Sequence, residues 1–178
     1  MQCYNKNKFI MKKILFSLVA LLAVMTMQAQ SICSSWHILQ PVVETNADGS
    51  FTAHSYTYTF YEDGTYYLVD EVTLASEPSQ TMALEVATAV ELNGTYTLNG
   101  NNLTLTPNMN TYKTELISIS RNGRVTNDSK VKANTNAKIN GKDFKNKYAN
   151  GKTYTVNIGD ALLQMNDVNY ARFATIKK

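Results

Sequence analysis

Residues 50–72 read SFTAHSYTYTFYEDGTYYLVDEV, and this stretch decides the fold class. Its first half alternates aromatic and polar side chains, so Tyr56, Tyr58 and Phe60 fall on one face of an extended chain. Successive side chains of a strand point to opposite faces of a sheet, whereas an amphipathic helix needs apolar residues three or four positions apart. The stretch therefore predicts a β-strand with one aromatic face.

The pair Asp63-Gly64 in the middle of this stretch is typical of a two-residue hairpin turn, because both residue types tolerate a positive φ. Such a turn would place Phe60 opposite Tyr67 in the next strand, so the aromatic face would continue across the hairpin. We expect four side chains to form this face and to be the candidate ligand-binding residues: Tyr56, Tyr58, Phe60 and Tyr67.

The chain around this hairpin consists of further runs rich in Thr, Tyr, Val and Leu. Turn signals interrupt these runs at Asn93-Gly94, at Asn99–Asn102 and at Asn122-Gly123. Short strands at such even spacing within one domain are typical of an antiparallel meander of about ten strands, closed into a barrel or folded into a sandwich. We predict an all-β fold, and an antiparallel meander barrel in particular.

Residues 124–150 differ from the rest because they are rich in lysine and asparagine. The spacing of Phe144 and Tyr148 suits one face of a short helix, whereas Asn140-Gly141 argues against one continuous helix. We expect strand remnants and a short helix or lid before the last strands.

The N-terminus has the order of a secretory signal peptide. Lys12 and Lys13 precede an apolar run, Ile14 to Val24, and a small residue follows at Ala29. The run is too short for a membrane-spanning helix, which needs about 20 apolar residues. We expect a signal peptide at 1–29 with its true start at Met11, and one domain at 30–178. The protein would be exported to the periplasm, the cell surface or the medium, without a membrane span.

Charge and cysteine content narrow the function further. Residues 30–178 hold 13 basic and 14 acidic residues, which gives no sign of a nucleic-acid partner. All 13 basic residues follow Tyr112, so a meander would carry one acidic and one basic flank. Cys33 is the only cysteine after the leader, which rules out a disulfide within the domain.

The sequence holds no pattern of catalytic or metal-ligating residues. The histidines His37 and His54 lack the spacing of a metal motif, so we expect them at the surface or at the rim of the barrel. No nucleophile motif of a hydrolase is present. We predict a protein that is not an enzyme and that holds neither a cofactor nor a metal.

The order of several segments resembles the lipocalin-like domains of secreted bacterial proteins, within the calycin group. The resemblance implies a barrel of about 8–10 strands with a cavity for small hydrophobic ligands. It also implies that Trp36 plugs the closed end of the barrel and that Arg172 packs across it. The segments that carry the resemblance are Trp36, Phe60–Tyr66, Gly94–Thr106 and Tyr170–Phe173.

Two functions stay open at this point. The first is a non-enzymatic binding protein that holds a small hydrophobic or amphipathic molecule against the aromatic face. The second is a structural or interaction protein, whose barrel is filled by its own side chains and which docks an envelope or protein partner through its charged flanks. A barrel of this size is just wide enough for side chains to fill it, so the aromatic face by itself does not separate the two.

Overall fold

The computed structural model describes residues 31–45, 47–76 and 84–174. The chain divides into two compact units, Met1–Ser31 and Ile32–Lys178, and all of the described helices and strands belong to the second. The predicted signal peptide and its start at Met11 lie outside the described residues. Among the described residues, no helix is long and apolar enough to span a membrane.

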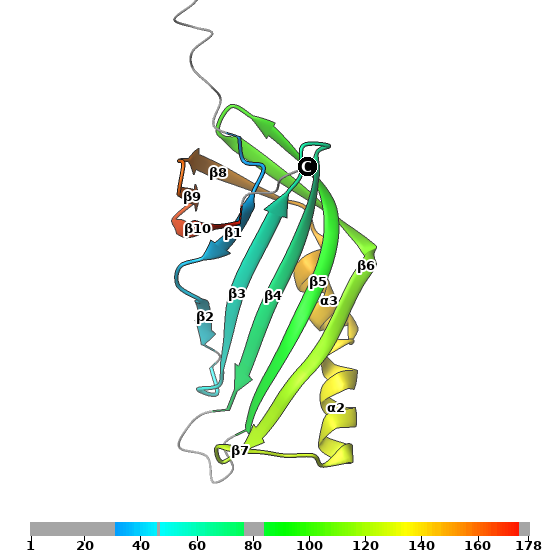
Figure 1. Cartoon of the computed structure of the whole chain (residues 1–178). Helices are drawn as coiled ribbons and strands as arrows, with labels where there is room; N and C mark the ends of the chain where they lie inside the picture. Colours follow the sequence, from blue (N-terminus) through cyan, green and yellow to red (C-terminus); the bar gives the residue numbers. More distant parts are fainter. Residues whose placement is uncertain (1–30, 46, 77–83, 175–178) are drawn as a thin grey trace, which may run out of the picture. The chain divides into compact units, whose positions relative to one another are not determined.

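The described part contains ten strands and two helices, so the predicted all-β class with a short helical segment before the last strands is confirmed (Figure 1). The elements in chain order are β1 (Ser35–Ile38), β2 (Val42–Thr45), β3 (Phe51–Phe60), β4 (Thr65–Ala75), β5 (Leu84–Asn99), β6 (Asn102–Arg121), β7 (Arg124–Val125), α2 (Ser129–Ile139), α3 (Lys142–Ala149), β8 (Lys152–Ile158), β9 (Leu162–Met165) and β10 (Val168–Ala174).

The strands form one antiparallel sheet in the order β1-β10-β9-β8-β6-β5-β4-β3-β2, and β1 pairs in addition with β3. The pairings of β1, β3 to β6 and β8 to β10 therefore close a circuit, which we call the strand ring. Only Asn102–Leu105 of the long strand β6 pair with β8, so the ring is closed at one end of the long strands. Figure 1 shows α2 and α3 alongside β6, lower in the view than the short strands β8 to β10.

The helical segment breaks where the sequence indicated. Helix α2 ends at Ile139 and α3 begins at Lys142, on either side of Asn140-Gly141. The carboxylate of Asp128 accepts hydrogen bonds from two backbone N–H groups of the first turn of α2, which defines its start. Phe144 and Tyr148 lie on one face of α3 and are both buried in the hydrophobic core. This face attaches the helix to the sheet.

The turn between β3 and β4 is longer than expected. Strand β3 ends at Phe60 and β4 begins at Thr65, so the loop spans four residues rather than two. At its base the backbone N–H of Tyr61 donates to the carbonyl of Thr65 at 2.9 Å. Asp63 stabilises this longer loop, because its carboxylate accepts from the N–H and the hydroxyl of Thr65 at 3.0 and 2.6 Å. Gly64 supplies the positive φ of 80° that the loop requires.

The longer loop shifts the hairpin register by one residue. Phe60 pairs with Tyr66 and Tyr58 pairs with Leu68, so the predicted pairing of Phe60 with Tyr67 is wrong. A shift of one residue exchanges the two faces of a strand. Tyr66 therefore lies on the inner face of β4 and is buried, whereas Tyr67 lies on the outer face and is only partly buried.

The expected turn at Asn93-Gly94 is also wrong, because these residues lie within strand β5. Gly94 pairs with Tyr66 on one side and with Pro107 on the other. A Cβ atom there would overlap the ring of Tyr66 and the backbone oxygen of Thr106. The glycine therefore serves close packing rather than a turn.

Gly94→Ala is expected to lower the free energy of unfolding by about 1–3 kcal/mol, the usual cost of overpacking. The overlap involves a backbone oxygen, which cannot rotate away as a side chain can. Chemical denaturation would measure the change, with Thr97→Ala at an exposed position of the same strand as the control. Equal stabilities of the two variants would contradict the packing role of Gly94.

Candidate functional site

A cavity of about 250 Å³ lies between the inner face of the sheet and helix α3. One part of its wall is apolar and comes from Leu68, Leu92 and Leu105, which are all buried. The polar part includes His54, Glu44 and Lys147. Five tyrosines contribute to the wall as well: Tyr56, Tyr58, Tyr66, Tyr148 and Tyr154.

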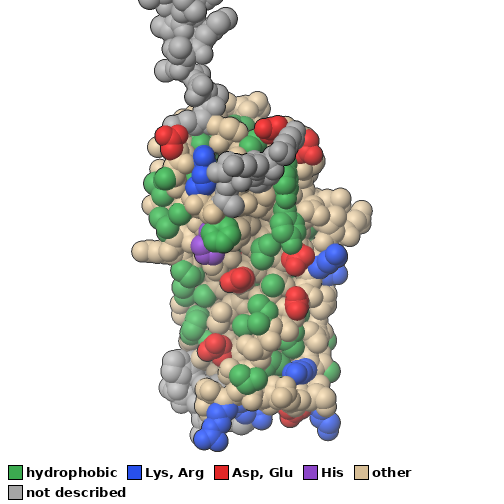
Figure 2. All heavy atoms as spheres, in the orientation of Figure 1, with side chains coloured by type: hydrophobic (Ala, Val, Ile, Leu, Met, Phe, Trp, Pro, Cys, Tyr) green, Lys and Arg blue, Asp and Glu red, His purple; other side chains and the backbone are tan. Residues whose placement is uncertain are grey.

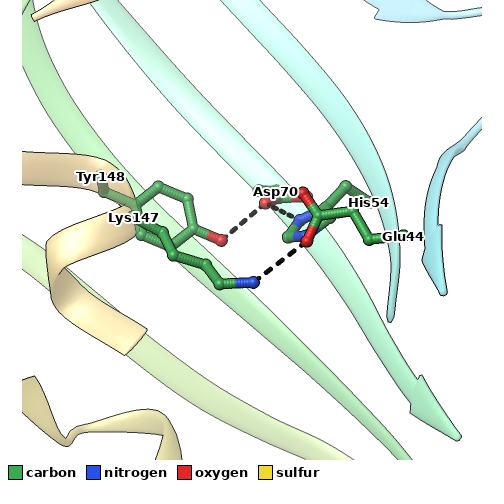
Figure 3. A network of polar contacts seen from close by, with 5 residues as sticks. All are labelled: Glu44, His54, Asp70, Lys147 and Tyr148. Atoms are coloured by element: carbon green, nitrogen blue, oxygen red, sulfur yellow. Dashed lines mark hydrogen bonds and ion pairs between the residues drawn. The ribbon is translucent and has the colours of Figure 1, made fainter. Parts of the chain in front are cut away.

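A buried hydrogen-bond network joins β3, β4 and α3 beside this cavity (Figure 3). Oδ2 of Asp70 lies 2.7 Å from Nδ1 of His54 and accepts from the hydroxyl of Tyr148, also at 2.7 Å. Asp70 is 0% exposed and His54 is 3% exposed. Such a carboxylate is costly to bury unless partners compensate for its lost hydration, and these two donors provide that compensation.

The strand periodicity brings the members of the network together. His54 lies on the inner face of β3, in phase with Tyr56 and Tyr58. Asp70 lies on the inner face of β4, diagonally across from His54, because its direct partner is Tyr56. Tyr148 reaches the same point from α3, which Phe144 anchors in the core. The network therefore depends on the docking of the helix.

An ion pair at the edge of the cavity links β2 to α3. Nζ of Lys147 lies 3.2 Å from the carboxylate of Glu44, and both side chains are about half exposed. Exposed pairs of this kind stabilise a fold by only about 0–1 kcal/mol. The pair cancels the charge of these two groups at the cavity edge (Figure 3), but it contributes little to holding the helix.

Burial shifts the tyrosine hydroxyls of the cavity toward their neutral form. It raises the pKa of Tyr66 to about 12, and it also raises the pKa values of Tyr56, Tyr58 and Tyr148. The negative charge of Asp70 adds to the rise in pKa at Tyr56 and Tyr148. At neutral pH these groups are hydroxyls that can donate and accept hydrogen bonds.

The structure brings three of the four predicted ligand-binding residues to one face and separates the fourth. Tyr56 and Tyr58 line the cavity. Phe60 lies on the same face, stacked on Tyr58 at 5.9 Å and packed edge-on against Tyr96, so it belongs to the core beside the cavity. Tyr67 lies on the outer face of β4, and Tyr66 occupies the inner position instead.

Trp36 and Arg172 lie in contact at the β1–β10 pair. The Arg172 guanidinium carbon is 4.8 Å from the centre of the Trp36 ring, a distance at which a cation–π attraction operates. The indole N–H donates to the carbonyl of Ile32 at 2.7 Å. Trp36 is 0% exposed, so its ring is a fully enclosed part of the core.

We expected both histidines at the surface or at the rim of the barrel. For His54 this expectation is wrong, because its side chain is only 3% exposed. Its strand phase places it inward, and Asp70 supplies the partner that makes burial tolerable. His37 is partly buried and lies on the face of β1 opposite to that of the buried Trp36. Its Nδ1 lies 2.8 Å from the hydroxyl of Thr57.

Sequence reasoning missed Asp70 and Tyr148 as site residues. Asp70 carries a usable signal, because it shares the phase of Leu68 and Val72, which are both buried. An acidic residue at an inward position of a strand needs a buried partner, and His54 is an inward residue of the neighbouring strand. Tyr148 carries no comparable signal, since only the docking of α3 brings it to Asp70.

In the described ranges, no three His, Cys, Asp or Glu side chains are placed to hold a metal ion. The face drawn in Figure 2 carries both acidic and basic side chains, with hydrophobic ones between them.

No protein-family model matches the chain, and no curated protein matches it.

Proposed function

We propose that the chain is an exported, non-enzymatic protein with a lipocalin-like barrel that holds a small hydrophobic or amphipathic molecule in the cavity beside α3. The observation that carries the proposal is the two-sided wall of the cavity. Leucines form one part of it, and tyrosine hydroxyls with His54 form the other. Ligand sites typically combine a mostly apolar wall with a few polar groups that orient the ligand.

Two features support the lipocalin-like part of the proposal. The closed circuit of strand pairings is the connectivity that a barrel needs. The stacking of Arg172 on Trp36 is the arrangement that the resemblance to calycins implies for the end of the barrel. The signal peptide predicted from the sequence at 1–29 supports the proposal of export.

The size of the cavity limits the ligand. Its volume of about 250 Å³ is slightly below the roughly 300–1,000 Å³ of sites for drug-sized molecules. A single ring or a short chain with one polar group suits this space, whereas a long acyl chain or a porphyrin does not.

Native mass spectrometry of the protein purified gently from its own host is expected to show a defined mass above that of the bare chain. The excess should disappear on denaturation, and its value gives the mass of the ligand. A bare-chain mass under native conditions would contradict the proposal. It would favour the filled barrel that docks a partner through its charged flanks.

Tyr58→Leu is expected to reduce the captured fraction or the affinity at least about tenfold, because it removes a hydroxyl and an aromatic ring from the cavity wall. Tyr67→Leu is the matched control, since Tyr67 belongs to the outer face of the neighbouring strand. Circular dichroism would verify that both variants fold. Equal losses in the two variants would argue against the cavity as the binding site.

A further inference from the structure

The hydrogen bond between His54 and Asp70 assigns a proton to one nitrogen of the imidazole. A carboxylate can only accept hydrogen bonds, so the Nδ1 atom that lies 2.7 Å from Oδ2 of Asp70 carries a hydrogen. In a neutral imidazole the other nitrogen, Nε2, is then an acceptor. The network thus gives His54 a defined orientation, and in the neutral imidazole it leaves the lone pair of Nε2 free.

Nε2 of His54 is available to a molecule in the cavity. The polar side-chain atoms that are sealed from solvent without a partner, among the described residues, are Oδ1 of Asp70 and Nε of Arg172. Nε2 is not one of these sealed atoms, although His54 is only 3% exposed and Nδ1 is its bonded nitrogen. His54 is also part of the cavity wall. In the neutral imidazole, Nε2 can therefore accept a hydrogen bond from a molecule in the cavity.

The surrounding charges favour an uncharged donor at this position. The carboxylate of Asp70 lies directly behind the imidazole, and an anion placed against Nε2 would be repelled by it in a medium of low dielectric constant. Glu44 and Lys147 face each other at 3.2 Å and cancel their charges. Lys152 contributes a further positive charge to the cavity wall, which disfavours a cationic ligand.

We infer that the ligand is a small uncharged ring that carries a hydroxyl group, such as a phenol or a ring alcohol. Its hydroxyl donates to Nε2 of His54, and its ring packs against Leu68, Leu92 and Leu105. This inference rests on the proposed binding function and names the ligand class for the same cavity. It assigns His54 as the residue that orients the ligand, with Asp70 as a positioning residue behind it.

Three matched probes test the inference on the purified full chain by isothermal titration calorimetry at neutral pH. They are 4-methylphenol, 4-methylanisole and 4-methylbenzoate, which share a ring of one size. We expect 4-methylphenol to bind at least about tenfold more tightly than either of the others, because only it is an uncharged donor. This preference is read from the unsubstituted protein and so does not depend on the folding of a variant.

The outcomes distinguish a failure of the ligand-class inference from a failure of the proposed binding function. Binding of all three probes with equal affinity would keep the binding function and overturn the assignment of a hydroxyl donor. Tightest binding of 4-methylbenzoate would overturn it as well, because the site would then take an anion. Absence of binding by every probe would count against both the inference and the proposed cavity function.

His54→Asn provides a second readout. The asparagine amide can still donate to Asp70 as Nδ1 does, but it lacks an atom at the position of Nε2. We expect this variant to bind 4-methylphenol no more tightly than 4-methylanisole. His37→Asn, at the outward histidine of β1, should keep the full preference. A preference that survives in His54→Asn would overturn the role of Nε2.

Discussion

Asp70→Ala is expected to lower the free energy of unfolding by about 1–3 kcal/mol for each of the two buried partners that it leaves unsatisfied. The carboxylate of Asp70 is fully enclosed and is the hydrogen-bond partner of both His54 and Tyr148. Alanine would leave both of these buried polar groups without their hydrogen-bond partner. Urea denaturation of the purified variant would measure the loss.

Asp70→Asn is the matched control for this change. The asparagine oxygen can accept from both His54 and Tyr148, while its amide group takes the place of Oδ1, which has no partner among the described residues. We expect it to cost less than half of what alanine costs. A loss below about 0.5 kcal/mol in Asp70→Ala would contradict the structural role of the network, since that is the range of ordinary surface changes.

A comparison of Asp70→Ala with Lys147→Gln tests which contact holds helix α3 against the sheet. Tyr148 is the residue of α3 that donates to Asp70, whereas the Lys147–Glu44 pair at the cavity edge is exposed and weak. Hydrogen exchange in α3 should therefore accelerate in Asp70→Ala more than in Lys147→Gln. Equal acceleration would assign the docking of the helix to the exposed ion pair instead.

Trp36→Ala is expected to lower the free energy of unfolding by about 3–5 kcal/mol, the usual cost of truncating a buried aromatic residue. The ring is fully enclosed, and its N–H donates to the carbonyl of Ile32. Removal of the ring would also take away the cation–π contact of the Arg172 guanidinium, whose Nε has no other partner among the described residues. The lost ring contacts and the lost cation–π contact both destabilise the folded chain.

Trp36→Phe and Arg172→Met divide this loss into its parts. The first keeps a ring under the guanidinium and removes the indole hydrogen bond, and the second keeps the apolar stem and removes the charge. Each should cost less than Trp36→Ala in thermal or urea denaturation. An alanine variant as stable as the unsubstituted chain would show that the ring is dispensable for closure between β1 and β10.

Local patterns in the sequence predicted the strands and much of their inner face correctly. The alternation around Tyr56 and Tyr58 defines a face without knowledge of the partner strand, because side chains alternate within one strand. The helical break at Asn140-Gly141 is likewise a local property of these residues. The two predicted turns at glycine pairs illustrate the limit of local patterns. Asp63-Gly64 lies in a longer loop, and Asn93-Gly94 lies inside a strand.

The candidate site could be predicted only in part, because its members come from distant segments. Tyr148 is 78 positions from Asp70 in the sequence, and no local pattern connects them. Similarly, the exchange of Tyr67 for Tyr66 follows from the four-residue loop, in which Asp63 bonds to Thr65. Local spacing cannot distinguish this loop from a two-residue turn.

The sequence by itself determined the all-β class, the aromatic inner face of β3 and the position of the helical segment, because each depends on the order of neighbouring residues. Tertiary structure alone decided the hairpin register, the close packing at Gly94 and the buried network of His54, Asp70 and Tyr148. These features depend on which strand or helix packs against which. A polar group such as Asp70 becomes part of a site only when that packing supplies its partners and excludes water.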